Sequence, residues 1–166
     1  MKRIVMLACS ALLMTFSVNA QKLGHIDGQA LLEALPEMKT ISATLEKQAG
    51  ELKSHLDNMR KEYETMYNEY VANQATWPEA IKQSKQGKIL DQEKSMTEFE
   101  DSANNEISKK QEELLAPVLE KAKKAIEEVG KENGFTYIFD TSQGVLLFIN
   151  GEDITPLVKT KLGIAN

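Results

Sequence analysis

The sequence has a single cysteine, Cys9, among its 166 residues. This cysteine lies in an N-terminal segment with the basic start, apolar stretch and small-residue end of a secretory signal, which closes on Val18, Asn19 and Ala20. We therefore expect residues 1–20 to be removed and the exported chain to contain no cysteine. That excludes disulfides, a thiol nucleophile and thiolate metal or iron–sulfur sites from the exported chain.

Basic residues and long apolar runs are also scarce after the signal. Removing Lys2 and Arg3 leaves 18 basic against 25 acidic residues, a net charge of −7. Nucleic acid is not an expected partner, because its phosphates call for clusters of Lys and Arg. No second apolar run approaches the roughly 18 to 20 residues needed to span a bilayer. We expect an exported protein of the bacterial periplasm.

Catalytic motifs are missing as well. The sequence has no GxSxG, Walker loop, GxGxxG or HExxH. His25 and Asp27 are two residues apart in a predicted strand and could begin a metal or acid/base site. No other histidine is near them in sequence, so a structural histidine is the simpler interpretation. We predict that the protein is not an enzyme and has no catalytic residues, cofactor or metal.

Two long helical seams dominate the rest of the chain. Between Met38 and Tyr70, apolar residues recur at nine successive intervals that together span 32 residues. Between Ile89 and Val129, a second series has eleven intervals that together span 40 residues. Both spacings are close to the helical repeat of about 3.6 residues per turn. The second seam has two polar interruptions, Gln92 and Lys110.

The segment between the seams predicts a tight turn. Thr76 followed by Glu79 fits a capping box, and Pro78 suits a first helical turn. So short a connection makes the two helices antiparallel neighbours. In such a pair, the numbers of two residues that face each other add to a constant, which is about 152 here. Pro36 then faces Ala116 and Pro117. We interpret this level as a junction between a helical hairpin arm, residues 37–116, and a body, residues 21–36 and 117–166.

The predicted body is a small set of strands and short helices. We expect a strand at 23–27, a short helix through Leu31, Leu32 and Leu35, and a short helix from Thr155 to Gly163. Residues 135–140 alternate as a strand does, and 145–149 are apolar on both faces, which predicts a buried central strand joined to 135–140 as a hairpin. The predicted fold class is α+β, mostly α.

So few strands cannot close a core and would leave apolar edges open. We therefore predict that the body oligomerises. The side chains expected at the contacts between copies are Ile26, Phe135, Tyr137, Phe139, Val145, Leu147 and Ile149.

The outer half of the arm is rich in methionine and aromatic residues where a rigid coiled coil would have Leu and Ile. Such side chains adapt to varied partners. The candidate binding residues are Tyr67 and Trp77, which lie off the seam or at its tip, together with Tyr63, Met66, Tyr70, Met96 and Phe99. For the last five, simply filling the seam remains the alternative. Lys82, Lys85 and Lys88 form a basic stripe that would suit either a membrane contact or a solvated face.

This layout resembles the Skp/OmpH-like family of periplasmic chaperones for outer-membrane proteins. The resemblance covers essentially the whole exported chain and is carried by Lys22-Leu-Gly-His-Ile-Asp27, Gln111-Glu-Glu-Leu-Leu-Ala-Pro117, Glu132-Asn-Gly-Phe-Thr-Tyr-Ile-Phe-Asp140 and Asp153-Ile-Thr155 leading into Val158. It implies a homotrimer with a β-barrel body, whose three arms enclose unfolded outer-membrane proteins without ATP.

One feature departs from the familiar enterobacterial member, whose arms are basic and suited to lipopolysaccharide. Residues 37–116 here contain 16 acidic and 11 basic residues, a net charge of −5. This charge does not favour lipopolysaccharide or membrane contact. The function implied is that of an ATP-independent holdase chaperone, and the alternative is a structural or adaptor coiled coil of the cell envelope with fixed partners.

Overall fold

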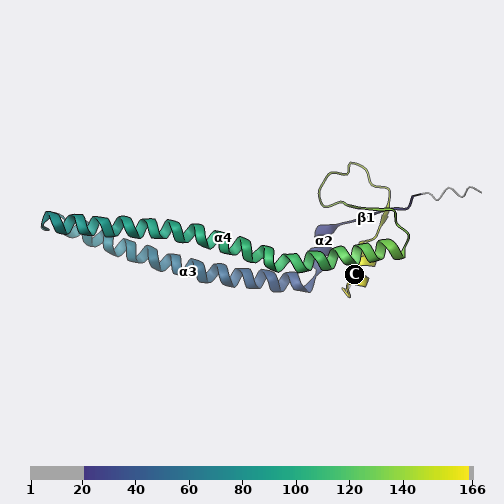
Figure 1. The fold of residues 1–166 in the computed structure, drawn as a ribbon, viewed down its shortest axis with the longest axis horizontal. Helices are drawn as coiled ribbons and strands as arrows, with labels where there is room; N and C mark the ends of the chain where they lie inside the picture. The colour runs from purple at the N-terminus through teal and green to yellow at the C-terminus, as the bar shows by residue number, and fades with distance from the viewer. Residues whose placement is uncertain (1–20, 165–166) are drawn as a thin grey trace, which may run out of the picture. The chain divides into compact units, whose positions relative to one another are not determined.

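The computed structural model describes residues 21–164, so the predicted signal segment lies outside the described residues (Figure 1). The chain is mostly helical with a small sheet, which confirms the predicted fold class. Its elements are β1 (Leu23–Ile26), α2 (Gly28–Ala34), α3 (Pro36–Asn73), α4 (Glu79–Glu132), β2 (Tyr137–Asp140), β3 (Glu152–Asp153) and α5 (Thr155–Lys161). Two compact units can be distinguished, residues 30–124 and, within the described residues, 21–29 with 125–164.

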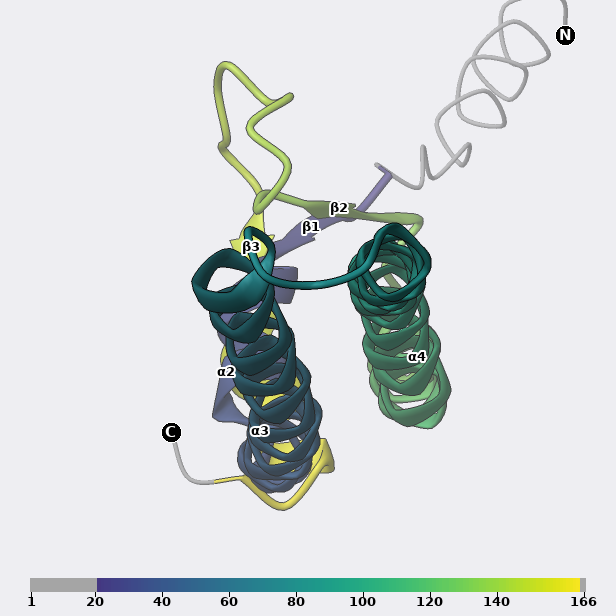
Figure 2. The same ribbon diagram turned by 90° about the vertical axis from the view of Figure 1, so that its left-hand side faces the viewer.

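The larger unit contains the predicted helical hairpin, in which α3 and α4 run side by side (Figures 1 and 2). Pro36 opens α3, where its missing N–H costs nothing. The predicted capping box is wrong: the Thr76 hydroxyl donates to the Asn73 carbonyl at the end of α3, 2.9 Å away. The Pro78 carbonyl instead accepts the first α4 hydrogen bonds, from the N–H groups of Ile81 and Lys82.

The predicted seam is confirmed by burial. Along both helices most of the least exposed side chains follow it, and Ile41, Ile89 and Val118 are buried, but Ala49 of the predicted seam is exposed. Side chains that meet across the helices include Gln48 with Glu106, His55 with Phe99 and Glu69 with Lys85. Their residue numbers add to 154, two more than the sequence predicts.

Only two helical layers cover this seam. Of residues 42–88, all of which the structure describes, none is buried. The larger apolar side chains of this stretch of the seam are therefore half-buried rather than enclosed.

The smaller unit contains a three-stranded sheet in the order β2-β1-β3. Strand β1 is central and parallel to both neighbours, with Leu23 opposite Tyr137 and His25 opposite Asp153. The strands predicted near 23–27 and 135–140 are thus confirmed, and so are the short helices α2 and α5. The sheet joins the start of the described chain to its end.

The predicted hairpin of 135–140 with 145–149 is wrong. Residues 145–149 form no strand, and Leu147 is 101% exposed. After β2, the Thr141 N–H and hydroxyl both donate to the Ile26 carbonyl at the end of β1. The chain is thereby held beside β1 instead of folding back along β2. The two-residue strand β3 occupies the other edge of β1.

The core of the smaller unit is built from Ile26, Ile154 and Val158, all at most 2% exposed. Gly24 allows this packing, because a Cβ there would come within 2.9 Å of the Phe135 ring and 3.3 Å of Ile154 Cγ2. Ion pairs from Lys161 to Glu128 and Glu132, at 3.3 and 2.6 Å, link α5 to the end of α4.

Two carboxylates of this unit, those of Asp140 and Asp153, make its stability depend on pH. Burial raises the pKa of Asp140, but N–H donors from Ser142 and Gly28 outweigh it, so the pKa lies below its usual value. Burial also raises the pKa of Asp153. The hydrogen bonds that its carboxylate accepts from the Thr155 hydroxyl and N–H outweigh this effect, so the pKa of Asp153 is lowered as well.

A carboxylate whose folded pKa is depressed contributes stability that is complete above its unfolded pKa of about 3.9. This contribution is lost as the pH falls through the folded pKa. Below about pH 4, we expect the thermal midpoint of the parent to decrease with falling pH. The decrease should be steeper than that of the double variant Asp140→Asn with Asp153→Asn, which lacks both carboxylates. Thermal unfolding followed by circular dichroism at a series of pH values measures this, and parallel curves would contradict it.

Candidate functional site

The aromatic residues near the hairpin turn form one connected group. Tyr67 is 48% exposed and stacks on Tyr63, with ring centroids 6.1 Å apart. Trp77 is half-buried, with its ring edge-on to Tyr70 at 6.3 Å and the Lys85 ammonium 5.4 Å from its centroid. Both residues predicted to lie off the seam therefore touch an aromatic residue that belongs to it.

The seam members of the predicted binding set are all partly accessible. Tyr63, Met66, Tyr70, Met96 and Phe99 are half-buried. These side chains lie along the hairpin seam and, within the larger unit of the described residues, also present part of their surface to solvent. The two interpretations offered by the sequence are therefore compatible, and partner contact by these residues stays a prediction.

The basic stripe near the turn is largely neutralised. Lys85 makes two contacts of 2.6 and 2.7 Å with the Glu69 carboxylate, and Lys82 lies 2.9 Å from Glu79. The hydrogen bond with Glu79 raises the pKa of Lys82. Two of the three lysines are thus paired with carboxylates, which favours the solvated-face interpretation over a membrane contact.

The apolar residues predicted to join copies of the chain are mostly exposed. We use the term apolar loop surface for Leu23, Tyr137, Phe139, Val145, Leu147, Phe148 and Ile149, each at least 42% exposed. A cavity of about 290 Å³ is lined by several of these residues and by His25 and Leu146. Leu23 and Phe148 were not among the predicted contact residues, although both are exposed large apolar side chains.

Two other predicted contact residues lie elsewhere. Ile26 is 2% exposed and belongs to the protomer's own core. Phe135 is half-buried, with the Lys22 ammonium 3.9 Å from its ring centroid. Oligomerisation itself stays a prediction, but these two side chains already have partners within one chain.

The predicted arm junction has a clear local structure. Pro117 lies inside α4 and is exposed. Glu37, in the first turn of α3, forms an ion pair with Lys121, one helical turn beyond Pro117. The hydrogen bond from Lys121 lowers the pKa of Glu37. The proposal that Pro36 and Pro117 mark a junction between arm and body stays a prediction.

The described residues offer neither a metal site nor a spanning segment. Among residues 21–164, no group of three or more His, Cys, Asp or Glu side chains is placed to hold a metal ion. No helix in this part of the chain combines the length and apolar character needed to cross a membrane.

Comparison with known proteins decides the family. A family model described as outer membrane protein (OmpH-like) matches residues 22–162. The chain belongs to the OmpH-like family. This confirms the resemblance inferred from the sequence and accounts for nearly all of the described residues of this OmpH-like chain.

The fold is also similar to a crystal structure described as that of an OmpH-like outer membrane chaperone from Caulobacter crescentus CB15. The two share 14% sequence identity with a TM-score of 0.72, over 89% of this chain and 87% of that chain. At this identity the likeness concerns the fold alone. No curated protein sequence matches this OmpH-like chain.

Proposed function

We propose that this OmpH-like protein is an ATP-independent holdase chaperone of the periplasm. It binds unfolded outer-membrane proteins between helical arms and keeps them from aggregating. The observation that carries the proposal is the long hairpin whose apolar seam stays half-exposed throughout residues 42–88.

This surface suits clients of varied sequence. Its accessible residues include methionines and tyrosines, whose side chains adapt to different partners and tolerate contact with water. Apolar contact is worth about 25 cal/mol per Å² removed from water, so many shallow contacts add up without nucleotide hydrolysis. Strands of outer-membrane barrels alternate apolar and polar residues and, when unfolded, expose the apolar set.

The apolar loop surface supports assembly as part of the same proposal. Contiguous apolar patches of this kind are uncommon on monomers and mark interaction sites. Several copies joined through this surface, three by family resemblance, would place several hairpins around one client. Each hairpin would contribute its seam.

Light scattering tests the proposal. An unfolded outer-membrane β-barrel protein is diluted from denaturant with and without the purified chain, residues 21–166, in the absence of ATP. Suppression of aggregation at stoichiometric ratios for several unrelated clients is expected. Binding to one fixed partner without any suppression would instead indicate a structural or adaptor protein.

A double substitution at the turn tests where clients bind. Tyr67→Ser with Trp77→Ser should weaken client capture by about tenfold, since two large accessible rings are lost. Helicity should change little, because most of the seam is left intact. Affinity for a labelled unfolded client measures the effect, and Leu119→Ser, at an exposed site far along α4, is the control. Equal capture by the double variant and the parent would exclude these aromatics from the binding surface.

A further inference from the structure

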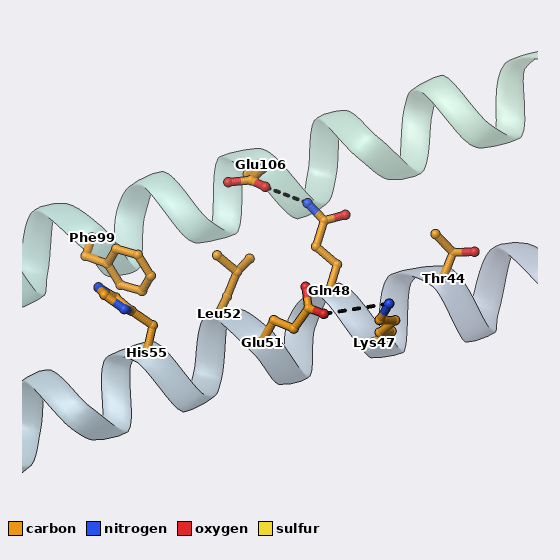
Figure 3. A pocket seen from close by; sticks show the side chains of 8 residues that line it. All are labelled: Thr44, Lys47, Gln48, Glu51, Leu52, His55, Phe99 and Glu106. Atoms are coloured by element: carbon orange, nitrogen blue, oxygen red, sulfur yellow. Dashed lines mark hydrogen bonds and ion pairs between the residues drawn. The ribbon is translucent and has the colours of Figure 1, made fainter.

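A groove lies between α3 and α4 (Figure 3). Its cavity volume is about 470 Å³. We call it the His55 groove, and its lining residues are Thr44, Lys47, Gln48, Glu51, Leu52, His55, Phe99 and Glu106. Both helices contribute to the groove within the same compact unit.

The floor of the groove is apolar and aromatic. Leu52 and Phe99 also line a second cavity between the same helices, of about 180 Å³, so neither is enclosed by the seam. The His55 ring lies against Phe99, with centroids 4.7 Å apart and planes tilted by 49°. These rings offer faces on which a flat or apolar group can rest.

Two carboxylates stand beside this floor. Glu106 accepts a hydrogen bond from Gln48 Nε2 at 2.5 Å through one oxygen, Oε1. Glu51 is 3.8 Å from Lys47, and both side chains are more than two-thirds exposed, so this pair is weak. A carboxylate offers about four acceptor positions, and both groups therefore keep capacity for a further donor.

The charge of the groove favours a cation. Its lining carries two acids, Glu51 and Glu106, against one lysine, Lys47. The surrounding hairpin has the same bias, with 16 acids against 11 bases in residues 37–116. An acidic segment would therefore be repelled from the groove and from the helices around it.

We propose that the His55 groove binds extended client segments in which a Lys or Arg side chain lies within two residues of an aromatic or large aliphatic one. The cation is held by Glu51 and Glu106, and the apolar side chain rests on Leu52 and Phe99. Side chains two apart on an extended chain point the same way, about 7 Å from one another, which suits neighbouring polar and apolar parts of one groove. This inference rests on the proposed holdase function and names the client chemistry it selects.

Arginine suits the groove better than lysine. Its planar guanidinium can stack on an aromatic ring while donating two hydrogen bonds to one carboxylate. Lysine offers a point charge without that fit. Binding should therefore decrease from Arg to Lys in otherwise identical segments.

Fluorescence anisotropy with three labelled peptides tests the proposal on the full chain, residues 21–166. The peptides repeat Arg-Ser-Phe, Glu-Ser-Phe or Arg-Ser-Ser. The first should bind most tightly. Glu51→Gln with Glu106→Gln should weaken its binding by about tenfold and leave the second peptide unchanged or bound more tightly. The amide introduced by Glu106→Gln keeps an acceptor for Gln48, so helicity should be preserved.

A matched control separates the groove from overall charge. Glu64→Gln with Glu93→Gln removes the same two charges from exposed positions of α3 and α4 outside the groove, and this variant should bind all three peptides as the parent does. Glu106→Lys should reverse the preference toward the Glu-Ser-Phe peptide. Equal binding of all three peptides by the parent, or equal weakening by the control and groove variants, would overturn the proposal.

The result is separable from the proposed function. Suppression of client aggregation without any peptide preference would contradict the groove proposal but not the proposed holdase function. If the chain shows the peptide preference but does not suppress aggregation, the holdase function is contradicted. The groove would then remain a site selective for segments that combine a cationic and an aromatic side chain.

Discussion

Leu147→Asp should convert the assembled protein into folded monomers. Leu147 is fully exposed in the single chain, so an aspartate there costs the protomer little. In the proposed assembly the same position is covered by another copy, where an unpaired charge costs several kcal/mol and weakens association at least about a hundredfold. Sedimentation velocity measures the mass, and circular dichroism checks that helicity is kept.

Leu90→Asp is the control for this prediction. Leu90 is also an exposed leucine, at 57%, but it lies on α4 in the outer half of the hairpin. The control should sediment as the parent does. If Leu147→Asp also sediments as the parent does, the apolar loop surface does not join copies of the chain.

Ile154→Ala should destabilise the smaller unit by about 2 to 5 kcal/mol. Ile154 is 0% exposed and ends next to Gly24, so its truncation leaves a cavity that the sheet cannot fill. The thermal midpoint of this unit should fall by roughly 10 °C or more. Near-ultraviolet circular dichroism, which reports on packing around Phe135, can follow this transition apart from the helical signal.

Leu157→Ala provides the comparison within the same segment. Leu157 is 38% exposed, so its removal creates little internal cavity and should cost much less. Equal losses at the two positions would mean that the smaller unit is not organised around Ile154.

The hairpin could be predicted closely because its signals are local. A repeat of about 3.6 residues reports the face of a helix whatever lies beyond it. The facing residue numbers add to 154 where the sequence predicts about 152. The hydrogen bonds of the turn itself were not predicted, since Thr76 bonds back to Asn73 and α4 starts from the Pro78 carbonyl. The periodicity of apolar residues gives no information about which hydrogen bonds form at a turn.

The sheet was harder to predict. The run at 145–149 has the apolar character of a buried strand, but sequence alone does not say whether burial occurs within one chain or against another. Strand β3, Glu152–Asp153, has only two polar residues and no recognisable pattern. The His55 groove was missed because Gln48, Glu51 and Glu106 carry no motif and come together only through helix pairing.

The parallel pairing of β1 also determines the order in which the chain can fold. Its partners β2 and β3 lie at the far end of the sequence, so the central strand is made first and must wait for both neighbours. The helical hairpin closes through a short turn and needs none of the C-terminal residues that complete the sheet. The sheet, in contrast, can close only when β1, β2 and β3 are all present. The residues of the apolar loop surface at 137–149 lie in the same C-terminal stretch, so they become available together with the strands that close the sheet.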